Sequence, residues 1–505
     1  MIITALAFLT VIWLAYKSYI IRKYPPGPFP LPIIGNLHLL RKDIHLAMDK
    51  LSKEYGTMFT LWMADKPFIV ITDYDLAKKV CITKRYADRL PLYVGDVVYS
   101  RGSKDIIMGD YSDSLILHRK LAQSAFQMFG DEMESLEVRV LDNLQTFFKT
   151  CNQHIEDPKF QIFHDVEHTF FNVMSTIVLG EKIRKDCDRF LKIREAVFYM
   201  MQSGVTLSMV NFYPVLRYLP NPELTKMIKV IQERDDVLQN LVSKIERDYD
   251  MVNKPSNYIE ALLRSKMENS DAENNNVENG DKKQFVDFTR DHLEMNVFDM
   301  FLAGVETVAV SATWSILFLI KWPEVQEKCH QHLDSIKGPK TDDGIQMPVR
   351  LEDKQHLSYF MAVIYETLRL ASTLPFGVFH KARENTTLNG FNIEKGTPFM
   401  INLWTIHHDP KNFKDALQFN PDRFLDQDGS LLPSSKIKNF LAFSAGPRQC
   451  IGQTIAKSEL FLFLTNFLYN FKLENSPLNK ELSTNGNTKV THAPKPFNVC
   501  LKHRC

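Results

Sequence analysis

The sequence predicts a mainly α-helical protein with small β-sheets, preceded by one N-terminal transmembrane helix. Between residues 75 and 332, apolar side chains recur mostly at i, i+3 and i+4, the spacing of helices that bury one face. Residues 56–72 and 391–400 instead carry strand-forming side chains around turn residues and predict two hairpins. Residues 1–21 are apolar almost throughout, and the run is long enough to cross a bilayer.

The composition is that of a large folded chain without a strong charge. The 505 residues are 45% hydrophobic, so the chain can bury a large core, and no internal repeat is present. Lys and Arg number 61 against 60 for Asp and Glu, so no overall field attracts nucleic acid. The seven cysteines are scattered and lack a C-x-x-C pair, which argues against a disulfide framework or a zinc site and suits a reducing, cytosol-facing domain.

The N-terminal segment is predicted to be an uncleaved signal anchor followed by a hinge. No basic residue precedes the apolar run of residues 1–21, whereas Lys17, Arg22 and Lys23 lie at or after its end, which leaves the bulk of the protein in the cytosol. A cleaved signal peptide is the alternative, but a basic n-region and a clear small-residue cleavage site are lacking. Residues 22–34 are basic and proline-rich, and they predict a stiff hinge because proline fixes φ and removes N–H donors.

Residues 35–505 are predicted to form a single domain. Residues 265–283, rich in Asn, Glu and Asp, have almost nothing to bury and predict a flexible internal loop rather than a domain boundary. The longest helix is expected from Asp291 to Lys321. Acidic and hydroxyl residues interrupt its apolar run, which argues against a second membrane span.

One cysteine lies in a setting that suits a metal ligand. The stretch from Phe443 to Gly452 reads F-x-x-G-x-R-x-C-x-G, with Cys450 just before an apolar run that predicts a helix. A helix N-terminus lowers the pKa of a cysteine, and the thiolate is the form that binds metals. Gly446 allows a turn with positive φ, and Gly452 lets the backbone lie close to a flat cofactor. Arg448 can pair with a carboxylate of that cofactor, and Phe443 can shield the sulfur from water.

A haem meets these demands, because an axial thiolate pushes electron density toward bound dioxygen and favours O–O cleavage. The motif resembles the haem-binding loop of the cytochrome P-450 haem-thiolate monooxygenases, and the likeness extends from Pro25 over nearly the whole chain. The resemblance implies the cytochrome P-450 fold and a haem b whose iron takes Cys450 as its axial ligand.

Residues 303–307, A-G-V-E-T, resemble the oxygen-activation motif of that family. Gly304, after Ala303, would leave room for dioxygen against the helix. Thr307 would donate a hydrogen bond to dioxygen as it is reduced, and Glu306 would relay protons inward, which is general acid chemistry in a dry pocket. The alternative is an acid and a threonine that are satisfied locally in a core helix.

Three further residues are expected to contact the haem carboxylates. Arg119 matches the arginine of the family's W-x-x-x-R pattern, whereas Leu115 stands where the Trp is expected and puts one propionate contact in doubt. His380 lies where many family members contact a propionate. Arg89 lies where several have another propionate-binding arginine, with a solvated surface charge as the alternative.

Three charged residues are expected to support the site from behind. Glu366 and Arg369 form E-x-x-R on one helix face, and Arg423 lies in the family's P-[ED]-R-F pattern. The resemblance implies that they form a buried structural network behind the haem, since a buried charge needs its partners. Thr373 and Phe376, which follow the E-x-x-R helix, are expected to line the substrate pocket.

The resemblance also implies a monooxygenase that inserts one oxygen atom from O2 into a lipophilic substrate. The sequence has no nucleotide-binding loop such as G-x-G-x-x-G, so electrons are expected from a separate NADPH-dependent flavoprotein reductase docked near Lys120, with cytochrome b5 as a further partner. The enzyme is expected in the endoplasmic reticulum membrane as a single-pass protein facing the cytosol. The apolar cluster in residues 208–229 is expected over the substrate entrance, touching the bilayer, with ordinary core packing as the alternative.

The substrate class is the least determined feature. Several runs, among them residues 401–408, are most similar to the steroid 17α-hydroxylase/17,20-lyases and to the aryl-hydrocarbon hydroxylases, which favours a steroid or sterol over a xenobiotic. In the steroid enzymes an arginine in a charged run orients the sterol oxygen, which makes Arg234 a candidate contact, with a solvated helix face as the alternative. A haem-thiolate isomerase or dehydratase is a further alternative, although such relatives commonly lack the pair that Glu306 and Thr307 supply.

Overall fold

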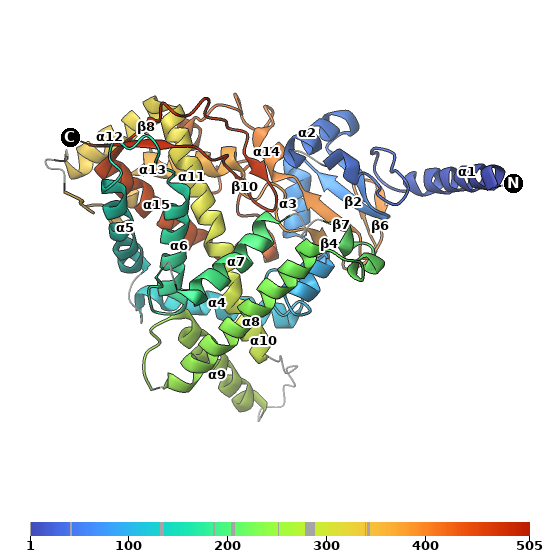
Figure 1. The fold of residues 1–505 in the computed structure, drawn as a ribbon, viewed down its shortest axis with the longest axis horizontal. Helices are drawn as coiled ribbons and strands as arrows, with labels where there is room; N and C mark the ends of the chain where they lie inside the picture. Colours follow the sequence, from blue (N-terminus) through green and yellow to red (C-terminus); the bar gives the residue numbers. More distant parts are fainter. Residues whose placement is uncertain are drawn as a thin grey trace.

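Helices dominate the fold, which Figure 1 shows as a computed structural model of the protein. The structure describes residues 2–504 apart from 41–42, 132–135, 185–186, 204–207, 251, 278–287, 339 and 341–343. In chain order the helices are α1 (Ile2–Ile21), α2 (Ile44–Tyr55), α3 (Tyr74–Ile82), α4 (Asp113–Asp131), α5 (Leu136–Asn152), α6 (Phe163–Val178), α7 (Asp188–Gln202), α8 (Pro222–Asp248), α9 (Tyr258–Val277), α10 (Arg290–Gly304), α11 (Glu306–Lys321), α12 (Pro323–Lys337), α13 (Ser358–Ala371), α14 (Leu403–His408) and α15 (Gln453–Asn470). The prediction of a mainly helical chain is confirmed.

The helices α11 and α15 form the centre of the core. Residues 308–320 of α11 and 458–470 of α15 are all buried, and α11 packs against α6, α13 and α15. A helix that is apolar on all sides must be surrounded by protein or lipid. Among the described helices, Arg290–Lys321 is long and apolar enough to cross a membrane, but 83% of its apolar window is buried inside the protein. It is a core helix, in agreement with the prediction against a second span.

The single helix predicted from Asp291 to Lys321 is interrupted at Val305, which separates α10 from α11. Thr307 Oγ1 donates a hydrogen bond to the Ala303 carbonyl at 2.5 Å. Threonine side chains that bond back to the i−4 carbonyl compete with the backbone ladder and bend helices. The interruption therefore arises within the motif that the sequence had marked for oxygen chemistry.

The largest sheet lies at the end of the molecule from which α1 projects (Figure 1). Its strands, in spatial order, are β1 (Met58–Met63), β2 (Lys66–Ile71), β7 (Pro398–Ile401), β4 (His380–Lys381) and β3 (Asp88–Arg89). β1 and β2 pair antiparallel, which confirms the hairpin predicted over residues 56–72. β7 runs parallel to β2 and antiparallel to β4, so the sheet joins segments from the two ends of the chain. Two other antiparallel pairs are β8 (Phe471–Asn475) with β11 (Val499–His503), and β9 (Asn487–Thr488) with β10 (His492–Ala493).

The hairpin predicted over residues 391–400 is wrong. β6 (Phe391–Ile393) pairs with β5 (Thr386–Leu388), whereas β7 joins the large sheet. Asn389 and Gly390 lie between β5 and β6 with φ of 48° and 83°, the left-handed conformations of a two-residue hairpin turn. This Asn-Gly turn sets the pairing, and the later turn at Gly396 only redirects the chain.

The loop predicted over residues 265–283 is wrong over its described part. α9 continues to Val277, and residues 278–287 lie outside the described part of the chain. The first turns of α9 bury Tyr258 and Leu262 in the core. A helix that has been nucleated extends by one backbone hydrogen bond for each residue added, so low apolar content does not by itself end it.

Glu366 and Arg369 on α13 form a buried ion network with Arg423. Arg369 Nε and Nη2 donate to the two carboxylate oxygens of Glu366 at 2.6 and 2.8 Å, and Arg423 Nε donates to the same carboxylate at 3.0 Å. Glu366 and Arg369 are 0% exposed. Arg369 also donates to the carbonyls of His407 and Ala416, which ties α13 to α14 and to the segment after it. This geometry supports the structural role expected of the three charges.

Replacing Glu366 with Gln tests this network. The amide would leave Arg369 and Arg423 without their anion, and stranding a buried charge costs about 3–5 kcal/mol. We expect E366Q to lower the free energy of unfolding by that amount in chemical denaturation. K53A removes the exposed pair of Lys53 with Asp49 and serves as the control, because such pairs contribute about 1 kcal/mol or less. Equal losses in the two variants would contradict the role assigned to Glu366.

Candidate active site

Segments from distant parts of the chain line one internal cavity, with Cys450 in its wall. The cavity lies between the α10–α11 break, the segments that follow α3 and α13, and the start of α15. The residues singled out from the sequence that line it are Arg89, Arg119, Ala303, Gly304, Thr307, Thr373, Phe376, His380, Phe443, Arg448, Cys450 and Gly452. The tertiary fold therefore brings together most of the predicted site, whereas Glu306, Arg234 and Gly446 lie outside this lining.

The loop that carries Cys450 is held in place by its backbone. Gly446 has a φ of 70°, and a Cβ there would lie 2.5 Å from the Cys81 carbonyl oxygen, so only glycine fits. The Cys450 N–H donates to the Phe443 carbonyl at 3.0 Å. Gly452 is the N-cap of α15, and a Cβ there would meet no described atom within 4 Å. The space beside Gly452, two residues after the sulfur, is therefore open.

The environment of the Cys450 sulfur differs from the expected one. Its side chain is open to the cavity but lies deep inside the protein, and this burial raises the pKa of the thiol instead of lowering it. The Gly452 N–H, Arg119 and Lys457 act in the opposite direction, and burial is the larger effect. The helix N-terminus alone does not hold a thiolate here, whereas a metal cation bound to the sulfur would.

Arg448 and Arg119 lie in the cavity wall with carbonyl oxygens as partners. Arg448 donates to the carbonyls of Gly109 and Ile107 at 2.8 and 2.7 Å, and Arg119 donates to the Gln449 carbonyl at 2.5 Å. The Nε atom of Arg448 is buried and has no partner among the described residues. Because a buried donor without an acceptor costs about 1–3 kcal/mol, this atom marks a place for an anionic group.

Arg89 and His380 reach the cavity from the paired strands β3 and β4. Arg89 is 6% exposed and donates to the Val378 carbonyl at 2.9 Å, so the alternative of a solvated surface charge is wrong. Burial, followed by the nearby Arg448, lowers the pKa of Arg89 well below its usual range. Burial also lowers the pKa of His380 to about 3. Its Nδ1 lies 2.9 Å from the Tyr86 carbonyl, which can only accept, so Nδ1 carries the proton of the neutral ring. A second proton, on Nε2, would make the buried ring a cation and would need an anion in the cavity.

The side chains of Arg89, Arg119, Arg448 and His380 are suited to bind the carboxylates of a haem. The cavity that contains the thiol is lined by three guanidinium groups, which repel one another, and by a histidine that burial keeps neutral. Bound carboxylates would offset the repulsion among the arginines and would favour the protonated histidine. Leu115, which stands where a Trp was expected, is 3% exposed and packs beside Gly109 without lining the cavity. The indole contact is therefore not replaced by Leu115.

The break between α10 and α11 forms another part of the wall. Ala303 and Thr307 line the cavity there. Gly304 was expected to leave room for dioxygen, but a Cβ on Gly304 would lie 2.2 Å from the terminal methyl carbon of Met174. The missing side chain therefore also makes room for Met174, while Gly304 itself lines the cavity, and its expected role beside dioxygen stays a prediction.

Glu306 lies behind this wall, where it is 4% exposed. Its Oε1 accepts hydrogen bonds from Gln202 Nε2 at 2.7 Å and from Thr491 Oγ1 at 3.4 Å. Burial raises the pKa of Glu306, while the donors Gln202 and Thr491 oppose that shift. The carboxyl therefore keeps its proton to a higher pH than a solvated glutamate, as suits a proton donor in a dry site.

Arg234 is buried outside the cavity lining. It is 0% exposed, donates to the Tyr99 carbonyl at 3.0 Å and pairs with Asp235 at 2.5 Å. The alternative of a solvated helix face is wrong, because the guanidinium also lies 4.5 Å from the centre of the Phe298 ring. Arg234 fixes the segment around Tyr99, which itself lines the cavity.

Comparison with known proteins assigns the fold and the site to a family. The family model described as "Cytochrome P450" matches residues 25–501. The chain belongs to the cytochrome P450 family. Curated relatives named "Steroid 17-alpha-hydroxylase/17,20 lyase" include those of Squalus acanthias, 32% identical over 96% of this chain and 93% of the relative, and of Gallus gallus, 31% identical over 88% and 85%. A solved structure described as "Zebra fish cytochrome P450 another structure with Progesterone" has a TM-score of 0.75 and 26% identity, and covers 91% of this chain and 99% of that chain.

This cytochrome P450 is a monooxygenase, and its family uses a haem-thiolate cofactor, a redox partner and a lipophilic substrate. The residues present fit that cofactor, since the cavity has a thiol open to it, a guanidinium donor without a partner and a glycine surface beside the sulfur. Bound haem supplies the activation of O2. The chain's own residues would bind the haem, exclude water and deliver protons.

The sequence did not single out Asp299 and Tyr99 as site residues, although both line the P450 cavity. The Tyr99 hydroxyl donates to one oxygen of Asp299, and the Ile106 N–H donates to the other at 2.9 Å. Burial raises the pKa of Asp299 well above its usual range. The sequence signal for this site is Asp299, an acid that interrupts an apolar helix one turn before Ala303. In the sequence the same interruption argues against a membrane span.

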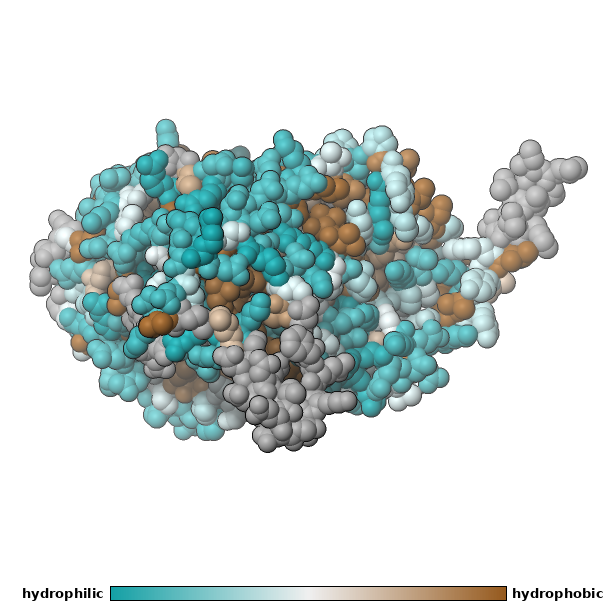
Figure 2. Space-filling model, turned by 90° about the horizontal axis from the view of Figure 1, so that it is seen from below, coloured by the Kyte–Doolittle hydropathy of each residue, from teal (hydrophilic) through white to brown (hydrophobic). Residues whose placement is uncertain are grey.

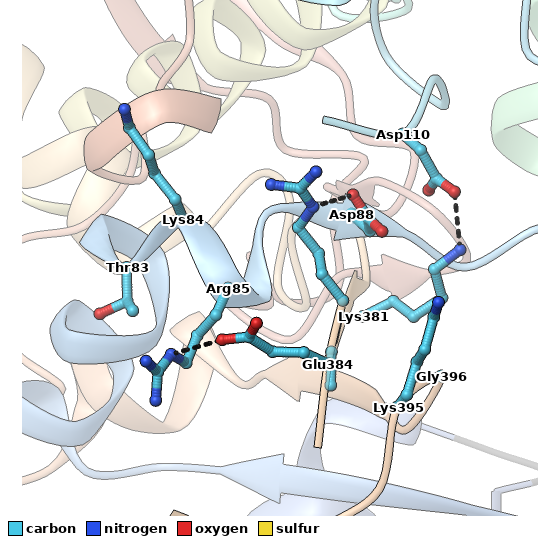
Figure 3. A pocket seen from close by; sticks show the side chains of 11 residues that line it. Thr83, Lys84, Arg85, Asp88, Asp110, Lys381, Glu384, Lys395 and Gly396 are labelled. Carbon is cyan, nitrogen blue, oxygen red and sulfur yellow. Dashed lines mark hydrogen bonds and ion pairs between the residues drawn. The ribbon is translucent and has the colours of Figure 1, made fainter. Parts of the chain in front are cut away.

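A polar cleft lies on the other side of the β3–β4 pair (Figure 3). Asp88 and Lys381 line this cleft, whereas their strand neighbours Arg89 and His380 line the P450 cavity, because successive residues of a strand face opposite sides. Figure 3 shows the pairs that cross the cleft. Cations outnumber acids in its wall, which contains Lys84, Arg85, Lys381, Arg383 and Lys395 against Asp88, Asp110 and Glu384.

Replacing Cys450 with Ser tests the ligand. A serine hydroxyl does not supply the thiolate, so we expect C450S to lose the absorption spectrum of thiolate-ligated haem in its reduced carbon monoxide complex. C187S is the control, because Cys187 is a partly exposed thiol that does not line the cavity. A thiolate spectrum that persists in C450S would exclude Cys450 as the ligand.

Proposed function

We propose that this cytochrome P450 hydroxylates a steroid or sterol. The observation that carries the proposal is the composition of the cavity wall. Next to Cys450 and Thr307 the wall is mostly apolar, and Asp299 and Tyr99 are among its polar residues. A rigid apolar skeleton with oxygen atoms at its ends has the matching form. The names of the relatives and the progesterone in the zebrafish structure support the same substrate class.

The apolar lining of the cavity is rich in methionine. It includes Met108, Met174, Met200, Met201, Met300 and Val490. Methionine fills irregular gaps and adapts to the shape of a ligand. Thr373 and Phe376 add to this wall, and Thr373 Oγ1 is engaged with Ser311 Oγ at 2.9 Å rather than free for a substrate.

In this proposal Cys450 would bind the iron of haem b, and Arg89, Arg119, Arg448 and His380 would hold its carboxylates. Glu306 holds a proton behind the helix break, and Thr307 passes it into the cavity from the face that Ala303 and Gly304 line. A positioned general acid contributes about 10²–10⁴ in rate. The proton then reaches dioxygen while the apolar wall keeps bulk water from the reaction.

The electron donor in this proposal is an NADPH-dependent flavoprotein reductase, with cytochrome b5 as a second partner. The polar cleft offers a basic docking surface, since Lys84 and Lys395 make no ion pair among the described residues. Lys120 is exposed on α4, and its neighbour Arg119 donates to the Gln449 carbonyl beside Cys450. An acidic residue of the electron donor that binds Lys120 would therefore lie next to Arg119, which lines the cavity.

We also propose a single-pass endoplasmic reticulum protein with a cytosolic domain over residues 35–505. The anchor is α1, and the hinge of residues 22–34 is fixed to the sheet because the Thr60 N–H donates to the Pro26 carbonyl at 2.9 Å. Figure 2 shows hydrophobic surface around the base of α1. The Tyr213 hydroxyl donates to the Ile33 carbonyl at 2.7 Å and joins two exposed apolar segments, whose members are Phe29, Leu31, Ile33, Val215, Tyr218 and Leu219. Such a patch suits contact with lipid.

An absorption titration of the purified ferric protein tests the substrate class. We expect a C21 steroid to convert the haem from low to high spin, and a planar polyaromatic compound to do so weakly. A response to the polyaromatic alone would contradict the steroid assignment and favour a xenobiotic hydroxylase. A protein that never shows a thiolate-ligated haem would contradict the whole assignment.

Vesicle flotation tests the lipid contact. In a chain that lacks residues 1–21, we expect the pair Y218S/L219S to weaken binding to phospholipid vesicles at least about tenfold, because two inserted side chains lose their apolar burial. V252S is the matched control, since Val252 is 90% exposed but lies outside the apolar patch. Equal binding by the two variants would contradict the proposed contact.

A further inference from the structure

Two residues outside the family motif donate hydrogen bonds to Glu306 from the side that faces away from the cavity. Gln202 Nε2 donates to Glu306 Oε1 at 2.7 Å and to Thr491 Oγ1 at 2.9 Å, and Thr491 Oγ1 donates to Glu306 Oε1 at 3.4 Å. Side chains from the end of α7, the start of α11 and the segment before β10 thus close one ring of hydrogen bonds. Glu306 is 4% and Thr491 0% exposed, so bulk water has little access to the bond between them, whereas Gln202 is partly exposed.

The ring lies one residue behind the cavity wall. Met201 and Val490 line the cavity, whereas their neighbours Gln202 and Thr491 do not. The Val490 N–H donates to the Met201 carbonyl at 3.2 Å and holds α7 to the segment before β10. Changes in Gln202 or Thr491 therefore alter the surroundings of Glu306 without removing a substrate contact.

Both hydrogen bonds end on the same carboxyl oxygen. Oε1 accepts from Gln202 and Thr491, and no hydrogen bond of Oε2 is seen among the described residues. Two donors on Oε1 fix the carboxyl plane and favour the proton on Oε2. The charged groups that face Glu306 are Glu167 of α6 and Arg194 of α7, which pair with each other at 2.7 Å and largely offset each other's effect.

We propose that Gln202 and Thr491 are positioning residues that orient the Glu306 carboxyl, so that Oε2 is the oxygen that releases and regains the proton used in oxygen activation. Neither residue touches substrate or cofactor, and both act through Glu306. The inference rests on the proposed acid role of Glu306, whichever lipophile is the substrate. It assigns a function to the end of α7 and to the C-terminal segment, which the sequence motifs left without one.

The test compares Q202L, T491V and T491S in the full-length holoenzyme, with E306Q as the reference. Loss of one such hydrogen bond is expected to lower kcat about fivefold and to raise the share of NADPH electrons recovered as hydrogen peroxide. KM and the steroid spectral titration should stay unchanged, because neither residue lines the cavity. T491S keeps the hydroxyl and should restore coupling. T169V is the control, since Thr169 is a buried threonine whose hydroxyl donates only to its own helix, at Asp165.

An infrared titration gives a readout that does not depend on turnover. The carboxyl band that disappears in E306Q identifies Glu306. In Q202L and T491V that band should persist to higher pH than in the unsubstituted chain, because the two donors lower the pKa of Glu306 and burial is then less opposed. T169V should leave the band where it is.

The outcomes separate the two levels of the proposal. If E306Q keeps full coupling, the proposed acid role of Glu306 fails and the positioning role fails with it. If E306Q is uncoupled while Q202L and T491V match T169V in coupling and in the infrared titration, only the positioning role is overturned. A loss in T491S equal to that in T491V would also overturn it, because the hydroxyl would then not be the active group.

Discussion

The placement of one cysteine sulfur with two buried arginines and a partly buried one around a single cavity is the constraint on which the rest of this structure depends. Burial raises the pKa of the Cys450 thiol and lowers the pKa of Arg89 and Arg448, so it disfavours the charged form of both kinds of group. A cofactor with a cationic metal and peripheral carboxylates resolves both problems together. The chain is thus built around a ligand whose charges complete it, which fits its membership of the cytochrome P450 family.

A very short strand pair separates the two charged regions of the molecule. In the β3–β4 ladder Arg89 pairs with His380 and Asp88 with Lys381, and the two pairs face opposite sides. Asp110 bridges the sides, because its carboxylate accepts from the Arg89 N–H at 3.0 Å and from Lys381 Nζ at 2.9 Å. The surface that we propose for the electron donor is therefore one residue away from the groups proposed to hold the haem.

The helix break shows how one short motif serves several purposes. The Thr307 hydroxyl bonds back to the Ala303 carbonyl and interrupts the helix, which exposes both residues to the cavity. Glu306, next in sequence, points to the other side and is held by α7 and the C-terminal segment. The core around α11 keeps this arrangement dry, and dryness makes a carboxyl retain its proton.

Some features of this chain are specified by a few neighbouring residues. The spacing around Cys450 and the A-G-V-E-T run depend on local chemistry, so they indicated the cofactor, the oxygen motif and the family before any fold was known. Asn389 and Gly390 carry a local hairpin signal as well, and it is this turn, not the one at Gly396, that pairs two strands. Such features depend on neighbours within a few residues, which is why a sequence can specify them.

The packing of the whole chain determines which groups from distant segments meet. The contact of Met174 with Gly304, the ring that Gln202 and Thr491 form with Glu306, and the burial of Arg234 all join segments whose relative positions depend on the packing of the whole core. The raised pKa of Cys450 has the same origin, because desolvation depends on everything that surrounds the sulfur rather than on the helix it precedes. Local pattern thus determined the chemistry that this chain can perform, and packing decided how its groups are oriented and charged.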